Sequence, residues 1–391
     1  MKMNPGHPAQ SGFTIVELLV GMLIGIITAV VIGQVMALSE GQKRTATSGS
    51  DTQVNGALAL YAIERDAKNA GYGMTSVSSG GIGCEVHMKN GANPVSNFTM
   101  VPAVVTDGTG GAPDTLRFMA SSKTGITLPT RISIDHPETA SNFFVDSDVG
   151  IQDNDMMIAV PAAGCSGTKW ATVFQVTNDP NPGGGGGGGG GQGQNKVIHN
   201  SGQSDWNQPG GQTILPAGGY TAGDYLINLG TLLDHTYSVS ANNLTLTEFS
   251  MATNSTASRD LYPQIVQIQA VYGKDDGATG TADDGIIDTW NATTPATNDG
   301  AAWRRIRAIR VALVARSPIL EKETVTTDGA AGTTTCDSAT PAPSSICWKP
   351  NPGGNGVKID VNIGNANPDW QRYRYRVYET TIPLRNVIWQ Q

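Results

Sequence analysis

A long apolar stretch near the amino terminus constrains this chain more than any other feature. From Phe13 to Leu38 the sequence is apolar except for Glu17, Gln34 and a few small hydroxyl residues. A helix needs roughly 20 such residues to cross the hydrocarbon core of a membrane, so the stretch predicts a membrane-spanning helix. Inside it, Glu17 costs roughly 2.5–3.5 kcal/mol on insertion scales and is therefore interpreted as functional, with a cationic partner expected.

No cationic side chain lies among the residues around Glu17 in this segment. The nearest cation would be a free amino group created by cleavage between Gly12 and Phe13. Residues 1–12 are polar, contain two prolines and are excluded from the fold. An ordinary secretory signal is cleaved after its apolar region, whereas the candidate cleavage site here precedes it.

The polar leader ending in Gly12, followed by FTIVE and an uninterrupted apolar helix, resembles the signal of type IV prepilins and type II secretion pseudopilins. The resemblance implies that a prepilin peptidase cuts after Gly12 and N-methylates Phe13. It also implies that Glu17 neutralises the terminal amine of a neighbouring subunit during assembly. The expected location is the inner membrane, with one span and a periplasmic head, and then the pilus at the cell surface.

Small residues recur every four positions along the apolar stretch, at Gly21, Gly25, Ala29 and Gly33. On a helix they form a ridge that another helix can approach closely, so packing against neighbouring subunits is expected.

Apolar spacing returns after a polar segment that contains Gly41 and Gly49. Val54, Leu58 and Tyr61 share a helical face that Leu60, Ile63, Ala67 and Ala70 widen, which predicts that this face packs into a globular head. The prediction is one helix over residues 13–72, weakened around Gly41–Gly56 and ending near Gly71 and Gly73.

The segment NGALALYAIERDAKNAGYG, Asn55–Gly73, is similar to a segment of PilW-type minor pilins, from which it departs at Glu64 and Lys68. Three later stretches agree with that family: Ile265–Asp276, Trp303–Ser317 and Tyr375–Asn386. The resemblance implies an α+β, pilin-like fold in which the long N-terminal helix packs on a large β-rich head, residues 73–391. It also implies a structural minor pilin that primes type IV pilus assembly and lies at the pilus tip. The implied partners are other minor pilins, the major pilin and the inner-membrane assembly machinery. A type II secretion minor pseudopilin, a tip adhesin and a DNA-binding module are the alternatives.

The head is predicted to be mostly β-strands, since charged residues are only 15% of the chain and 49 residues are glycine. The expected strands cover residues 115–121, 131–135, 155–160, 171–178 and 225–230, a hairpin over 238–249 that turns at Asn242–Asn243, and the three later stretches. The nine consecutive glycines Gly183–Gly191 predict a flexible loop over 181–194. This loop either separates two lobes or interrupts one.

The four cysteines, Cys84, Cys165, Cys336 and Cys347, all follow the membrane segment. In an oxidising periplasm an even count suggests disulfides, and three pairings are possible. The preferred pairing is Cys336–Cys347, which closes a short loop, together with Cys84–Cys165. No metal site is expected, because CxxC spacing is absent and the five histidines are scattered.

One loop is rich in aspartate, between Lys274 and Trp290. The weak alternative to a solvent-facing turn is calcium binding, because calcium takes clustered carboxylate oxygens, although the EF-hand spacing is not met. The candidate ligands are Asp275, Asp276, Asp283, Asp284 and Asp288.

Arg372, Arg374 and Arg376 alternate with tyrosines and would share one face of a strand. Such a stripe can contact single-stranded nucleic acid, but the alternative is pairing with the carboxylates of the head. A net charge of −8 and one short stripe make nucleic acid an improbable partner. The GxSxG, HExxH and Walker A motifs of hydrolases, zinc proteases and nucleotide-binding enzymes are absent, so neither catalysis nor a cofactor is expected.

Overall fold

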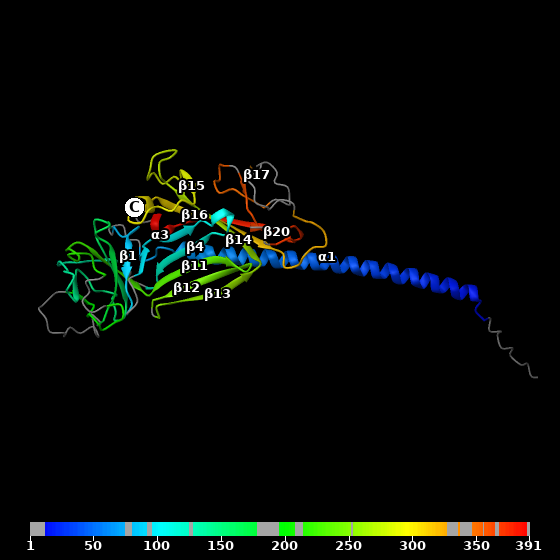
Figure 1. Cartoon of the computed structure of the whole chain (residues 1–391), viewed down its shortest axis with the longest axis horizontal. Helices are drawn as coiled ribbons and strands as arrows, with labels where there is room; N and C mark the ends of the chain where they lie inside the picture. Colours follow the sequence, from blue (N-terminus) through cyan, green and yellow to red (C-terminus); the bar gives the residue numbers. More distant parts are fainter. Residues whose placement is uncertain are drawn as a thin grey trace, which may run out of the picture. The chain divides into compact units, whose positions relative to one another are not determined.

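A long N-terminal helix and a β-rich head make up the structure, a computed structural model (Figure 1). It describes residues 12–74, 80–91, 96–124, 128–177, 195–207, 214–251, 253–326, 335–336, 346–354, 356–363 and 367–388. The chain divides into one unit that ends at Asp51 and a second that extends from Thr52 to Gln391. The expected α+β, pilin-like layout is confirmed.

Helix α1 (Ile15–Asn69) continues without a break through both predicted weak points. Gly41 and Gly49 each cost only about 1 kcal/mol, which is too little to end the helix, and the predicted weakening there stays a prediction. The helix ends where Gly71 and Gly73 adopt φ angles of 80° and 68°, a conformation that suits glycine. The Gly71 N–H then donates to the Met119 carbonyl at 2.7 Å, which attaches the end of α1 to the head.

The largest sheet has six strands in the order β2-β1-β8-β7-β10-β5. Alternating residues of β7 face opposite ways, so that Met156 and Ile158 enter the main core while Met157 and Ala159 enter a second one. The strands are β2 (Ser96–Thr99), β1 (Glu85–Met88), β8 (Ala171–Gln175), β7 (Met156–Val160), β10 (Tyr225–Gly230) and β5 (Thr130–Arg131).

A second, antiparallel sheet has the order β13-β12-β11-β4-β3. Its strands are β13 (Ser255–Pro263), β12 (Asn243–Ser250), β11 (Leu232–Ser240), β4 (Thr115–Ser121) and β3 (Ala103–Thr106). The hairpin between β11 and β12 is confirmed, but its turn residues are Ala241 and Asn242, with φ angles of 49° and 62°. Asn243 instead pairs with Ser240, so the predicted turn is wrong by one residue.

The closing strands build a third sheet in the order β15-β14-β16-β20. They are β15 (Thr289–Asn291), β14 (Ile265–Lys274), β16 (Ile306–Arg316) and β20 (Tyr375–Pro383). Smaller elements are β6 (Asn142–Val145) paired with β9 (Asn195–Ile198), the set β17 (Thr335–Cys336), β19 (Gly356–Lys358) and β18 (Cys347–Trp348), and helices α2 (Gly300–Arg304) and α3 (Arg385–Ile388).

Most expected strands match the structure to within three residues, but the one over 131–135 is wrong. Only Thr130 and Arg131 form a strand there, because the chain leaves β10 after two paired positions. β13 was not predicted, since its side chains are mostly exposed and polar and show no apolar alternation.

The main hydrophobic core joins the inner face of α1 to all three large sheets. A second core lies on the other face of β7 and β8 and contains Phe143, Val176 and Val197. Val176 precedes the glycine-rich segment and Val197 follows it, so residues from both sides share one core. The predicted loop over 181–194 itself lies outside the described residues.

Candidate functional site

The first turn of α1 is held by Thr14 and Glu17. The Glu17 carboxylate accepts hydrogen bonds from the Thr14 N–H at 3.0 Å and the Thr14 hydroxyl at 3.1 Å. In return, the Glu17 N–H donates to the Thr14 hydroxyl oxygen at 3.3 Å. This reciprocal pattern is a capping box, and the T-x-x-E spacing in the sequence could have predicted it.

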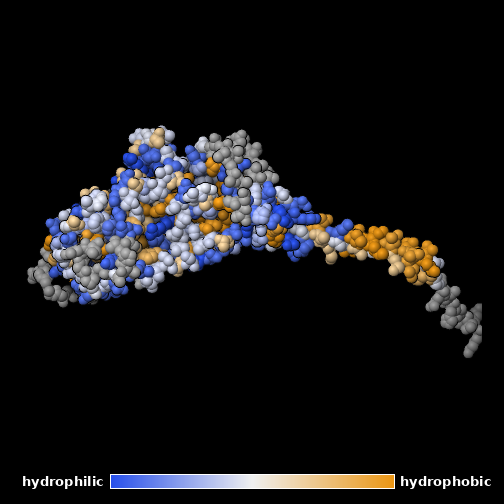
Figure 2. All heavy atoms as spheres, viewed as in Figure 1, coloured by the Kyte–Doolittle hydropathy of each residue, from blue (hydrophilic) through white to orange (hydrophobic). Residues whose placement is uncertain are grey.

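The first half of α1 is exposed along its whole circumference, from Ile15 to Leu38, and so are Phe13 and Thr14 before it. It is the one helix among the described residues that is long and apolar enough to cross a membrane (Figure 2). A side chain added at Gly21, Gly25 or Gly33 would meet no atom within 4 Å. The predicted ridge of small residues, with Ala29, is therefore open to another helix.

In the second half of α1, the structure confirms one side of the predicted buried face and corrects the other side. Val54, Leu58 and Tyr61 are 53%, 43% and 62% exposed and do not enter the core. The predicted Ile63, Ala67 and Ala70 are buried, and Leu60 is half-buried against the core. Gly56, Ala59 and Ala62 complete the buried face and were not part of the prediction. Small side chains let the helix approach the sheets closely, which is why the bulkier residues face outward.

Gly56 lies directly against the ring of Tyr378 on β20. The Tyr378 hydroxyl donates to the Thr52 carbonyl of α1 at 3.3 Å. Neither residue was singled out from the sequence, although the regular spacing of small residues in Asn55–Gly73 was a signal for this close approach.

A polar cluster joins α1 to β11 further along the helix. The Asp66 carboxylate accepts from the Tyr237 hydroxyl at 2.6 Å and lies 2.7 Å from His235 Nδ1. The hydrogen bond with Asp66 is the main reason that the pKa of His235 is raised. Sequence patterns gave no sign of this cluster, because its members are about 170 residues apart.

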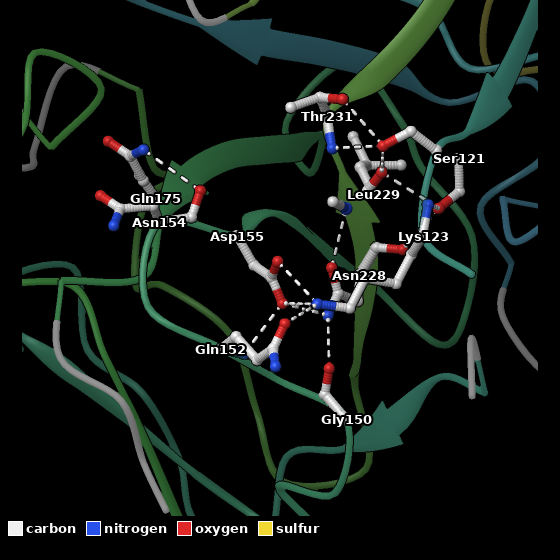
Figure 3. Close-up of polar contacts among 12 residues, drawn as sticks. Ser121, Lys123, Gly150, Gln152, Asn154, Asp155, Gln175, Asn228, Leu229 and Thr231 are labelled. Carbon is white, nitrogen blue, oxygen red and sulfur yellow. Dashed lines mark hydrogen bonds and ion pairs between the residues drawn. The ribbon is translucent and has the colours of Figure 1, made fainter. Parts of the chain in front are cut away.

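A second polar cluster joins the end of β4 to β10 (Figure 3). Lys123 Nζ lies 2.9 Å and 2.8 Å from the two Asp155 carboxylate oxygens and 2.9 Å from the Gln152 side-chain oxygen. The Asn228 amide donates to Asp155 at 2.7 Å. These groups use their hydrogen-bonding capacity on one another. The cluster therefore holds the two strands in place, and the Asp155 carboxylate is not free to bind a ligand.

Cys84 and Cys165 form a disulfide, as preferred from the sequence. Cys347 is also disulfide-bonded. The side chain of Cys336 lies outside the described residues, so the pairing of Cys336 with Cys347 stays a prediction.

The aspartate-rich loop between β14 and β15 is held by internal bonds. Asp275 is fully buried and accepts from Arg307 Nη2 at 2.9 Å and from the Gly285 N–H at 2.8 Å. The other four carboxylates also have partners: Asp276 with Thr289, Asp283 with Arg305, Asp284 with the Ile286 N–H and Asp288 with the Gly277 N–H. Among the described residues no three metal-ligating side chains come together, so the loop gives no support to calcium binding.

The arginine stripe is not a stripe in the structure, because only Arg376 lies in β20. Arg372 ends a short 3-10 helix (Trp370–Arg372) and donates to the Glu321 carbonyl at 2.9 Å. Arg374 donates to the Glu321 carboxylate at 2.8 Å. The prediction of three guanidinium groups on one strand face is therefore wrong, and two of them meet a single acidic residue.

An apolar helix followed by a β-rich head with these closing strands is the layout of a pilin-like protein. Residues 234–386, less than half of the chain, match the family model described as Type IV Pilus-assembly protein W. Three of the stretches that resemble PilW-type pilins lie inside this match, and Asn55–Gly73 lies outside it. No curated protein and no solved structure matches the chain. The match supports a PilW-like protein of type IV pilus assembly, which suggests a role other than catalysis.

Proposed function

We propose that this chain is a structural minor pilin that primes type IV pilus assembly. It would lie at the tip together with other minor pilins, and the major pilin would lie beneath them. A prepilin peptidase would cut it between Gly12 and Phe13 and methylate Phe13. The protein would wait in the inner membrane with its head in the periplasm until the assembly machinery draws it into the pilus. The observation that carries this proposal is the exposed apolar helix beginning at a capped Thr14, joined to a head whose closing part is PilW-like.

Two exposed features of α1 support a role in assembly. The ridge that contains Gly21, Gly25 and Gly33 is open to close helix packing. The apolar stripe of Val54, Leu58 and Tyr61 gives a neighbouring subunit a surface next to the head. The match with a pilus-assembly family favours the pilus over a type II secretion system.

The capping box makes it possible to test the charge of Glu17 separately from its hydrogen bonds. Glutamine at this helical position also completes a capping box, so Glu17→Gln keeps the box and removes only the charge. Thr14→Ala is the matched control, because it removes the cap, at a cost of about 1 kcal/mol of helix stability, and keeps the carboxylate. We expect Glu17→Gln to accumulate in the membrane and to be depleted from pili, since it cannot neutralise a neighbour's terminal ammonium.

Immunoblots of sheared pili and membrane fractions give the measurement, with N-terminal mass spectrometry of the assembled protein. Wild-type protein should begin with methylated Phe13, and Thr14→Ala should enter pili. Normal incorporation of Glu17→Gln, or an assembled protein that begins at Met1, would refute the proposed role. Depletion of both variants to the same extent would show that assembly needs the helix cap as well as the charge.

A further inference from the structure

A cavity of about 180 Å³ opens into the second core of the head and takes no part in the assembly surfaces described above. Its inner lining includes Phe143, Phe174, His199 and Trp206, all at least nine-tenths buried. Its other described lining includes Glu138, Thr139 and Ser141, which are exposed or half-buried. We propose that this cavity binds one sugar unit of a neutral glycan.

Two buried histidines determine which hydrogen-bonding groups the inner end of the cavity offers to a ligand. His136 Nε2 and His199 Nε2 lie 2.9 Å apart, so one of these nitrogens carries the shared proton. His136 is 1% exposed, is stacked on Phe143 and has no partner for its Nδ1. A buried N–H without an acceptor is rarer than a buried acceptor without a donor, which assigns the His136 proton to Nε2.

His199 must then carry its own proton on Nδ1, as a hydrogen-bond donor. No other described residue accepts from this nitrogen, and His199 lines the cavity. Burial lowers the pKa of His136 to about 4 and that of His199 to about 3, so both rings are neutral at neutral pH.

Trp206 adds a second donor at the cavity. It is 4% exposed, and no described residue accepts a hydrogen bond from its indole N–H. Buried donors of this kind normally have partners, so both groups suit a ligand that brings oxygen acceptors.

Size and charge narrow the class of ligand. An apolar cavity of about 150 Å³ holds benzene, so this one has room for about one six-membered ring. The C–H groups of a sugar ring carry slight positive charge and suit the negative face of Phe174, whereas Phe143 is stacked on His136 and Phe174 and supports that ring from behind. The described lining contains the carboxylate of Glu138 and no lysine or arginine, which disfavours an anion. The N–H groups of His199 and Trp206 carry partial positive charge, which disfavours a cation. An unsubstituted aromatic ring has no oxygen to accept hydrogen bonds from them.

The test uses the full-length protein in a detergent without sugar groups. The probes are the methyl glycosides of glucose, galactose and N-acetylglucosamine at millimolar concentration, observed by saturation-transfer NMR. We expect transfer from the protein to the ring C–H protons of at least one glycoside. Thr139→Trp should abolish it, because the exposed Thr139 lines the cavity and a larger ring there fills the entrance.

Ala257→Trp is the matched control, since Ala257 is exposed on β13 and does not line the cavity. His199→Phe keeps an aromatic ring and removes one hydrogen bond, so it should weaken binding by about two- to tenfold. Circular dichroism confirms that each variant is folded. The proposal is overturned if no glycoside shows transfer, if Thr139→Trp binds like the control, or if N-acetyltyrosinamide binds while the glycosides do not. The last result would indicate a site for an aromatic peptide side chain.

Discussion

His136 and His199 show how far the fold alters individual side chains. Burial among Phe143, Phe174 and Tyr220 is the main cause of their lowered pKa values, about 4 and about 3, and for His199 the charge of His136 is a second cause. The carboxylates in this region are Asp135, which precedes His136 in the chain, Glu138 at the cavity and Asp224 beside Tyr220. The pKa of His235 shifts upward instead, because it is hydrogen-bonded to Asp66. As the pH falls, the buried histidine pair therefore lowers the free energy of unfolding, whereas His235 raises it.

We predict that stability falls in acid because of the buried histidine pair. An unfolded histidine takes up a proton below about pH 6.5, whereas folded His136 does so only near pH 4. Between these values the unfolded state binds more protons, so the free energy of unfolding decreases as the pH falls. His136 alone corresponds to a loss of roughly 3 kcal/mol over this window.

The comparison is between wild type and the double variant His136→Phe with His199→Phe, by urea denaturation from neutral pH to about pH 4. Asp114, whose pKa burial raises to about 6, and His235 oppose the effect but are common to both proteins. Wild type should lose more stability than the double variant. Parallel pH profiles would show that the pair does not titrate as described.

At the scale of elements, α1 depends on a face of small residues. Gly56 gives the closest approach, because an added Cβ would overlap the Tyr378 ring. At an exposed helical position, replacing glycine with alanine stabilises by about 1 kcal/mol. At Gly56 the sign should reverse, since the ring and its hydrogen bond to Thr52 must shift.

We expect Gly56→Ala to destabilise the head by about 1–3 kcal/mol, the usual cost of overpacking. Gly41→Ala is the control, because no atom lies within 4 Å of the added Cβ and the helix gains stability. Adding Tyr378→Ala to Gly56→Ala should recover part of the loss relative to Tyr378→Ala alone. Thermal denaturation of the four variants measures these differences, and equal effects of the two alanine substitutions would contradict the close contact.

At the scale of the whole molecule, the Cys84–Cys165 disulfide joins residues 81 positions apart in the sequence. It connects the start of the head with the turn between β7 and β8. A crosslink that closes a loop of this length restricts the unfolded chain strongly, and native disulfides typically contribute 2–5 kcal/mol.

The double variant Cys84→Ser with Cys165→Ser should therefore be less stable by about 2–5 kcal/mol in urea denaturation. Thiol titration of the unfolded variant should still find no free cysteine, since Cys347 is bonded in the native protein. An unchanged denaturation midpoint would show that the loop is already restrained by the sheets.

The α+β layout followed from the resemblance to pilins, and the Cys84–Cys165 pairing from the even number of cysteines and the short loop between the other two. Local patterns in the sequence were enough to predict the apolar helix and most strands. Each of these depends on neighbouring residues, on composition or on strong β alternation, which survive in an isolated segment. The closing strands and their PilW-like character were also visible, because β14, β16 and β20 are long and rich in β-branched residues.

Tertiary structure alone decided which face of α1 is buried and where the polar groups meet. The predicted face ran from Val54, Leu58 and Tyr61 to Ile63, Ala67 and Ala70. The sheets cover only the side with Ile63 and the alanines, and Val54, Leu58 and Tyr61 stay exposed. The contacts of Asp66 with His235 and of His136 with His199 join distant segments. The sequence by itself therefore determined the elements and their order. Their packing was decided by close approach and long-range pairing, because these depend on the backbones of several elements at once.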